Sequence, residues 1–168
     1  AQIWPTMDFN DRSGLATSSR KTGIQIWGDR YPDGDHELNA KMLFGAENPP
    51  GKMYISGSQD HIGLLYPGIN RLCYNGDYWP EKIESTTSGV ICEWLSQVLH
   101  LVPLVPRPDG YDPLKIKHLE EPLIRELGEA GDACWESILT KDVTGLGKSL
   151  TNTLLSWKKI LPLTVPDW

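Results

Sequence analysis

The last third of the chain carries the feature that most constrains its fold, two apolar stripes at helical spacing. In the first stripe, apolar residues recur at steps of four, three, four and four: Leu123, Leu127, Ala130, Cys134 and Ile138. This spacing places them on one face of a helix that extends over about Glu121–Leu139. A helix of this kind is stable only when another layer of structure covers its stripe.

A second stripe follows after a three-residue linker, Thr140-Lys141-Asp142. Its apolar positions again repeat at helical spacing: Leu146, Leu150, Leu154, Trp157 and Ile160/Leu161. Asp142 is a favourable N-cap residue, and Pro162 ends the helix because proline has no backbone N–H to donate. Two amphipathic helices with so short a linker predict an αα-hairpin.

Two shorter helices are predicted in the first half of the chain. The first extends over Leu15–Trp27, with Ser13 or Thr17 as its N-cap. The second covers His36–Phe44 and ends at Gly45. We expect three of its apolar side chains to point inward: Leu38, Met42 and Leu43.

Between these helices and the C-terminal hairpin, strand signals are mixed with turns. Asn70–Tyr74 predicts a strand that ends at the hairpin-type dipeptide Asn75-Gly76. Val90–Leu101 predicts a helix or a helix–strand pair, and Pro103–Pro113 predicts a proline-rich connector. The sequence therefore predicts an α+β fold with a mixed sheet and a C-terminal αα-hairpin. We expect a first lobe over residues 1–88 and a helix-rich second lobe over residues 89–168.

Charge and apolar patterning exclude several classes of function. The chain has 16 Lys+Arg against 22 Asp+Glu, a formal net charge of −6, whereas a nucleic-acid platform needs a surplus of basic residues. No apolar run approaches the roughly 18 residues of a membrane span, because Pro103 and Pro106 break the run that begins at Leu99. The first residues lack the basic and then apolar order of a signal peptide. We expect neither a nucleic-acid partner nor a membrane partner.

The cysteines and histidines favour a reduced, cytoplasmic protein without a metal centre of its own. Cys73, Cys92 and Cys134 are scattered and form no Cys-x-x-Cys pair. The four histidines share no metal-ligand spacing, which argues against zinc: His36, His61, His100 and His118.

The first candidate for chemistry is a hydroxyl-rich segment where the first helix begins. Residues 12–20 read Arg-Ser-Gly-Leu-Ala-Thr-Ser-Ser-Arg, which places four hydroxyl groups around Gly14. Free N–H groups at a helix N-terminus attract anions, and hydroxyl groups add donors or a Mg²⁺ ligand. The segment therefore predicts a phosphate loop, and a simple helix cap at Ser13 or Thr17 is the alternative.

The second candidate is an aspartate between small residues and an apolar stretch, in the segment Ser56-Gly57-Ser58-Gln59-Asp60-His61-Ile62-Gly63. A carboxylate at the edge of a core has surroundings that can tune its pKa, and it can accept the proton of an attacking hydroxyl group. An Asx-turn or a helix cap at Asp60 is the structural alternative.

Together, the two segments resemble the GHMP family of small-molecule kinases, especially its sugar-kinase branch. The family's Gly-Leu-Gly-Ser-Ser-Ala phosphate loop is matched by Gly14-Leu15-Ala16-Thr17-Ser18-Ser19, with Ala16 for the second glycine and Thr17 for a serine. Its sugar kinases then carry a glycine, an aspartate, an apolar stretch and a Gly-Gly or Pro-Gly pair. Gly57-Ser58-Gln59-Asp60 and Pro67-Gly68 are similar to that pattern. The C-terminal helix pair is similar to part of the family's second lobe.

The resemblance implies part of a two-lobed kinase that transfers phosphate from ATP to a sugar hydroxyl group, with Mg²⁺. Four loop residues would hold the ATP phosphates: Gly14, Thr17, Ser18 and Ser19. Among them Ser18 would contact Mg²⁺. Asp60 would act as the catalytic base or orient the sugar hydroxyl group. Three neighbours would lie beside the sugar: Ser58, Gln59 and His61.

Other functions stay open at this stage. The family's later glycine-rich loop is not visible, so we expect either a fragment of a longer kinase or a shortened relative that binds sugar or nucleotide without catalysis. Self-association is a third hypothesis, because the C-terminal stripes need a cover. Tyr78-Trp79-Pro80 is either a platform on which a sugar ring stacks or a set of packing aromatics.

Overall fold

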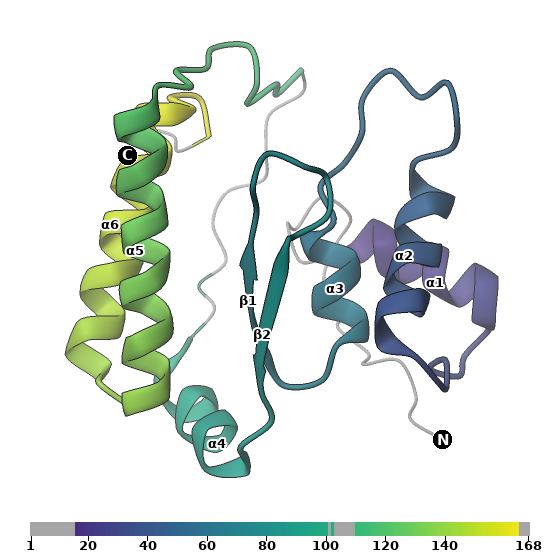
Figure 1. Cartoon of the computed structure of the whole chain (residues 1–168), viewed down its shortest axis with the longest axis horizontal. Coiled ribbons are helices and arrows are strands. Elements are labelled where there is room, and N and C mark those ends of the chain that lie inside the picture. The colour runs from purple at the N-terminus through teal and green to yellow at the C-terminus, as the bar shows by residue number, and fades with distance from the viewer. Residues whose placement is uncertain (1–15, 101, 103–109, 165–168) are drawn as a thin grey trace. The chain divides into compact units, whose positions relative to one another are not determined.

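The computed structural model describes residues 16–100, 102 and 110–164. They form two compact units, which divide between Thr87 and Ser88, one residue before the predicted boundary. The fold is α+β, as predicted. Within the described ranges it consists of six helices and one two-stranded sheet (Figure 1).

Three helices and a hairpin make up the first unit: α1 (Thr17–Trp27), α2 (His36–Glu47), α3 (Gln59–Leu65), β1 (Ile69–Cys73) and β2 (Lys82–Thr86). Helix α2 packs against α1 and α3, and α3 also contacts β1. The core consists of four fully buried side chains from α2 and α3: Ala40, Leu43, Ile62 and Leu65. This core fixes α2 and α3 against each other, and Trp27 at the end of α1 packs against it.

Helix α2 begins and ends at side-chain caps. The carboxylate of Asp35 accepts the backbone N–H groups of Glu37 and Leu38, at 2.8 and 3.1 Å. At the other end, the side-chain amide of Asn48 donates to the carbonyl oxygen of Phe44, 2.9 Å away. The helix therefore runs through Gly45, where the sequence predicted its end, and carries Glu47 in its last turn.

The predicted inward face of α2 is wrong for two of its three residues. Leu38 and Met42 are 58% and 48% exposed, and only Leu43 is buried. The buried face instead follows Asn39, Leu43 and Glu47 at steps of four, with Ala40 beside them. Leu38 and Met42 are out of phase with this row by one residue, which is about 100° around a helix.

The hairpin of the first unit is antiparallel, not part of the mixed sheet that the sequence predicted. Ile69 pairs with Thr86, and Leu72 pairs with Ile83. Strand β1 lies one residue before the predicted strand, whereas β2 was not predicted. A loop without a crossover joins the two strands, and such a connection allows only antiparallel pairing.

The second unit contains α4 (Gly89–Val98) and the αα-hairpin of α5 (Glu121–Thr140) and α6 (Val143–Ile160). The predicted hairpin is confirmed, and its helices lie side by side (Figure 1). Asp142 caps α6 as predicted, since its carboxylate accepts the N–H group of Thr144 at 3.0 Å. The predicted helix near Val90–Leu101 is α4. Residues 101 and 103–109 of the predicted segments lie outside the described residues.

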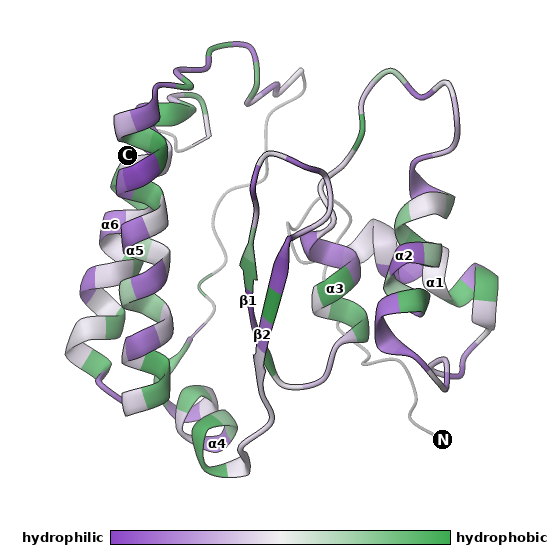
Figure 2. Ribbon diagram, viewed as in Figure 1, coloured by the Kyte–Doolittle hydropathy of each residue, from purple (hydrophilic) through white to green (hydrophobic). Residues whose placement is uncertain are grey.

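Both helices of the hairpin, α5 and α6, carry polar residues between apolar ones along their length (Figure 2). Within the described ranges, no helix combines the length and the apolar character that crossing a bilayer requires.

Candidate functional site

The start of α1 presents a helix N-terminus that no described side chain caps. Thr17 is the first helical residue, not the N-cap, and Ser13 lies outside the described residues. The N-cap position is occupied by Ala16, whose backbone is left-handed, with φ of 53°. The first turn of α1 therefore begins with backbone N–H groups of the kind that receive anions in other proteins.

One carboxylate, that of Glu47, joins the three helices of the first unit. Its Oε2 atom accepts the hydroxyl group of Ser19 and the Nε2–H group of His61, each at 2.7 Å. Its Oε1 atom accepts the hydroxyl group of Thr22 at 2.9 Å. Ser19 and His61 are only 2% and 1% exposed, so this polar cluster lies inside the unit.

Glu47 is the charged member of this cluster. Burial raises the pKa of Glu47, but the hydrogen bonds from Ser19, Thr22 and His61 outweigh burial and hold the pKa below its ordinary value of 4.5. An ionised carboxylate only accepts hydrogen bonds, so Nε2 of His61 carries a proton. The other ring nitrogen, Nδ1, is buried and has no hydrogen-bond partner among the described residues.

Asp60 lies beside this cluster, in the first turn of α3. Burial raises the pKa of its carboxyl group above the ordinary value of 3.8. The charge of His61 lowers the pKa, and the charge of Glu47 raises it. Within the described part of the chain, the Asp60 side chain forms no hydrogen bond and no ion pair. Both carboxylate oxygens therefore retain their capacity to accept hydrogen bonds.

A second polar group surrounds Ser58, the N-cap residue of α3, which is fully buried. The Ser58 hydroxyl oxygen lies 2.9 Å from the hydroxyl oxygen of Tyr74 and 2.6 Å from the backbone carbonyl oxygen of Tyr78. These bonds tie the start of α3 to the loop that follows β1.

The structure brings only some of the predicted site residues together. The structure brings together the buried side chains of Ser19 and His61 on Glu47, and Asp60 precedes His61 in α3. Thr17 and Ser58 are buried nearby in the first unit, whereas Ser18 and Gln59 are exposed. Gly14 lies outside the described residues.

The aromatic segment after β1 is divided between packing and exposure. Trp79 packs edge-on against Phe44 with ring centroids 6.1 Å apart, and the Nζ atom of Lys41 lies 5.2 Å from its ring centroid. Tyr78 is 59% exposed. The geometry therefore favours packing for Trp79.

Glu47 is the site residue that the sequence reading missed. The prediction ended the second helix at Gly45, which left Glu47 in a loop. One signal could have found it, because Asn39, Leu43 and Glu47 step by four along the buried face of that helix. A carboxylate on a buried face needs hydrogen-bond donors around it.

The cluster near α1 contains oxygen atoms of the kind that bind magnesium. In the described part of the chain, no three His, Cys, Asp or Glu side chains gather into a metal cage. Mg²⁺ bound with a nucleotide needs only one or two protein oxygens, because phosphate and water supply the others. The ionised carboxylate of Glu47 and the hydroxyl group of Ser19 are two such oxygens, and a metal ion bound there would displace hydrogen bonds that Glu47 now accepts.

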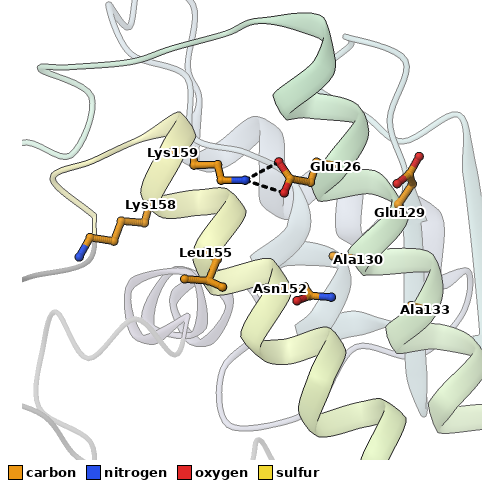
Figure 3. Close-up of a pocket in the computed structure, with 8 residues that line it drawn as sticks. All are labelled: Glu126, Glu129, Ala130, Ala133, Asn152, Leu155, Lys158 and Lys159. Atoms are coloured by element: carbon orange, nitrogen blue, oxygen red, sulfur yellow. Dashed lines mark hydrogen bonds and ion pairs between the residues drawn. The ribbon is translucent and has the colours of Figure 1, made fainter.

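The second unit has a groove of its own, of about 450 Å³, between α5 and α6. Small, apolar and charged residues line it, and a Lys159–Glu126 ion pair at 2.6 Å lies along it (Figure 3). The residues that line this groove include none that the sequence analysis singled out for chemistry. The candidate site is therefore the cluster of the first unit.

Comparison of this chain with protein-family models, with curated proteins and with solved structures finds no match. The resemblance to GHMP kinases thus rests on the sequence motifs alone.

Proposed function

We propose that this chain carries the phosphate loop and the catalytic aspartate of an ATP-dependent sugar kinase of the GHMP type. One observation carries the proposal: Ser19 and His61 donate to the same oxygen of Glu47. Ser19 belongs to the predicted phosphate loop, and His61 follows the predicted catalytic aspartate. Their shared partner supports a common site for two motifs that are far apart in the sequence.

The start of α1 is the phosphate side of the proposed site. Its N–H groups and the positive end of its helix dipole would attract the ATP phosphates, with Gly14, Thr17 and Ser18 around them. Mg²⁺ supplies positive charge that neutralises the phosphates during transfer. Glu47 and Ser19 would hold it, so the geometry favours Ser19 over the predicted Ser18.

Asp60 is the proposed catalytic base. Its raised pKa makes it a stronger proton acceptor than an ordinary aspartate, and its carboxylate has no partner to displace within the described residues. The exposed Gln59 would lie beside the sugar, whereas Ser58 is fully buried and bonded within the protein, so the predicted sugar contact of Ser58 is not retained. Phosphoryl transfer depends on position and charge more than on covalent chemistry, so a few well-placed groups suffice. A kinase of this class would use the ATP of the cytoplasm.

A non-catalytic sugar- or nucleotide-binding module is the second candidate. The left-handed backbone of Ala16 favours it, because the family carries glycine at this position and a Cβ atom there costs stability. Such a module would use the same residues for binding alone.

Calorimetry combined with an ADP-release assay separates the two candidates. The intact protein is titrated with Mg²⁺·ATP and assayed with D-galactose, D-mannose, D-glucose and L-fucose. Heat of binding with sugar-dependent ADP release supports the kinase, heat without turnover supports the binding module, and neither signal contradicts both.

The neighbouring serines provide a matched pair for the magnesium site. Ser19→Ala removes the buried hydroxyl group next to Glu47, and we expect it to weaken Mg²⁺·ATP binding by about tenfold. Ser18→Ala changes an exposed residue and should have a smaller effect. Equal effects of the two changes would contradict the assignment of Ser19.

A further inference from the structure

The hydroxyl group of Tyr74 has a fixed hydrogen-bond direction. The buried Ser58 hydroxyl group lies 2.6 Å from the carbonyl oxygen of Tyr78, and a carbonyl oxygen only accepts. Ser58 has one proton and donates it there. The bond of 2.9 Å between Ser58 and Tyr74 therefore requires Tyr74 to donate its phenolic proton to Ser58.

This direction determines what Tyr74 offers to a ligand. The Tyr74 hydroxyl group donates its only proton to Ser58. Its oxygen atom can therefore only accept further hydrogen bonds. The residue is 43% exposed, which leaves part of it open to solvent. A ligand that reaches the Tyr74 oxygen can donate a hydrogen bond to it but cannot accept one from it.

Asp60 offers hydrogen-bond acceptors of the same kind nearby. It lies two residues after Ser58, and its carboxylate has no partner within the described residues. Burial raises the pKa of Tyr74, the Ser58 hydrogen bond lowers it, and the charge of Asp60 raises it. The hydrogen bond between Tyr74 and Ser58 brings the phenol to the start of α3, where Asp60 follows Ser58 by two residues. Two neighbouring acceptors disfavour an anionic ligand and favour a neutral molecule with several hydroxyl groups.

We propose that Tyr74 positions the sugar, with its phenolic oxygen accepting a hydrogen bond from a hydroxyl group adjacent to the one that Asp60 deprotonates. This inference rests on the proposed function and defines its substrate further, as a polyol with neighbouring hydroxyl groups. Tyr74 is a positioning residue, because it receives no proton of the reaction. Because the bond to Ser58 already fixes its orientation, the Tyr74 side chain loses little freedom when the sugar binds.

Tyr74→Phe is the direct test, because it keeps the ring and removes the acceptor. We expect the KM for the sugar to rise about tenfold, with the affinity for Mg²⁺·ATP unchanged. The control is Tyr54→Phe, which removes a hydroxyl group from a 60% exposed tyrosine of the same unit. A Tyr74→Phe enzyme with the KM of the wild type would overturn the inference.

Monodeoxy sugars separate a contact from a structural effect. The best hexose of the panel is compared with its monodeoxy analogues, in the wild type and in Tyr74→Phe. One of these analogues lacks the hydroxyl group that Tyr74 contacts. With that analogue, we expect the wild type and Tyr74→Phe to have the same KM. If the difference is the same for every analogue, Tyr74 acts on the fold and the inference is wrong.

The same experiment distinguishes this inference from the proposed function. A wild-type protein that turns over no hexose contradicts the proposed function and, with it, this inference. If the wild type turns over a hexose and Tyr74→Phe has the same KM for it, only the role of Tyr74 is contradicted.

Discussion

Ser19 of α1 and His61 of α3 donate hydrogen bonds to one and the same oxygen of Glu47, each over 2.7 Å. Both donors are almost fully buried. Because Glu47 ends α2, this single atom links three helices that the core also holds together. The cluster thus has a structural role as well as the proposed chemical one, and the two roles can be tested separately.

Glu47→Gln should destabilise the first unit by about 2 kcal/mol. The neutral amide weakens the three hydrogen bonds that Glu47 accepts. It also replaces one carboxylate oxygen with an NH2 group, which cannot accept a hydrogen bond. The measurement is the free energy of unfolding in urea at pH 7. The control is Glu37→Gln, which breaks an exposed ion pair with Lys41 and should cost less than about 0.5 kcal/mol. Equal losses in the two variants would show that the cluster has no special role.

The stability of the protein should depend on pH through Glu47 and Asp60 in opposite directions. The pKa of Glu47 is lowered in the folded state, so its contribution is present above pH 4.5 and is lost as the pH falls through the folded pKa. The pKa of Asp60 is raised above 3.8, so its ionisation costs stability as the pH rises through the folded pKa.

Two variants separate these contributions in urea titrations between pH 7 and pH 3. Glu47→Gln should lose less stability than the wild type as the pH falls, and Asp60→Asn should lose more. Identical pH profiles for all three proteins would contradict the assigned pKa shifts.

Gly68→Ala should destabilise the hairpin by about 2 kcal/mol or more. Gly68 has a φ of 74°, and a Cβ atom there would collide with the carbonyl oxygen of Thr86 at the end of β2. Gly63→Ala is the matched control, since it lies in α3 with open space around it and should stabilise by up to about 1 kcal/mol. Thermal unfolding should show a lower stability for Gly68→Ala and a higher one for Gly63→Ala. A Gly68→Ala variant as stable as the wild type would contradict the close contact between Gly68 and the Thr86 carbonyl oxygen.

Ala16→Gly should stabilise the protein by about 1 kcal/mol, because it relieves a left-handed backbone at the start of α1. The same substitution in a regular helix has the opposite effect. Ala46→Gly, at an exposed position of α2, should therefore destabilise by about 1 kcal/mol. Chemical unfolding of both variants checks the prediction, which is wrong if Ala16→Gly also lowers stability.

Helices with long apolar stripes could be predicted from the sequence. The α5–α6 hairpin and the Asp142 cap follow from periodicity and cap chemistry that act locally. Strand β2 could not be predicted in this way, because Lys82-Ile83-Glu84-Ser85-Thr86 has one strongly apolar residue and forms a strand by pairing with β1.

The candidate site was only half predictable, for a similar reason. Ser19, Asp60 and His61 belong to local motifs, so their residue types alone drew attention to them. Glu47 became visible only through its partners, since its role depends on the packing of α2 between two other helices. The choice between Ser18 and Ser19 likewise depends on which of them faces Glu47.

The most direct test of the central claim is the rate of sugar-dependent ADP release by the intact Asp60→Asn protein relative to the wild type. Removal of a general base should lower the turnover number by about 10² to 10⁴. The free energy of unfolding at pH 7 should not fall, because the substitution removes a half-buried charge without a partner. An unchanged turnover number in Asp60→Asn would contradict the kinase assignment.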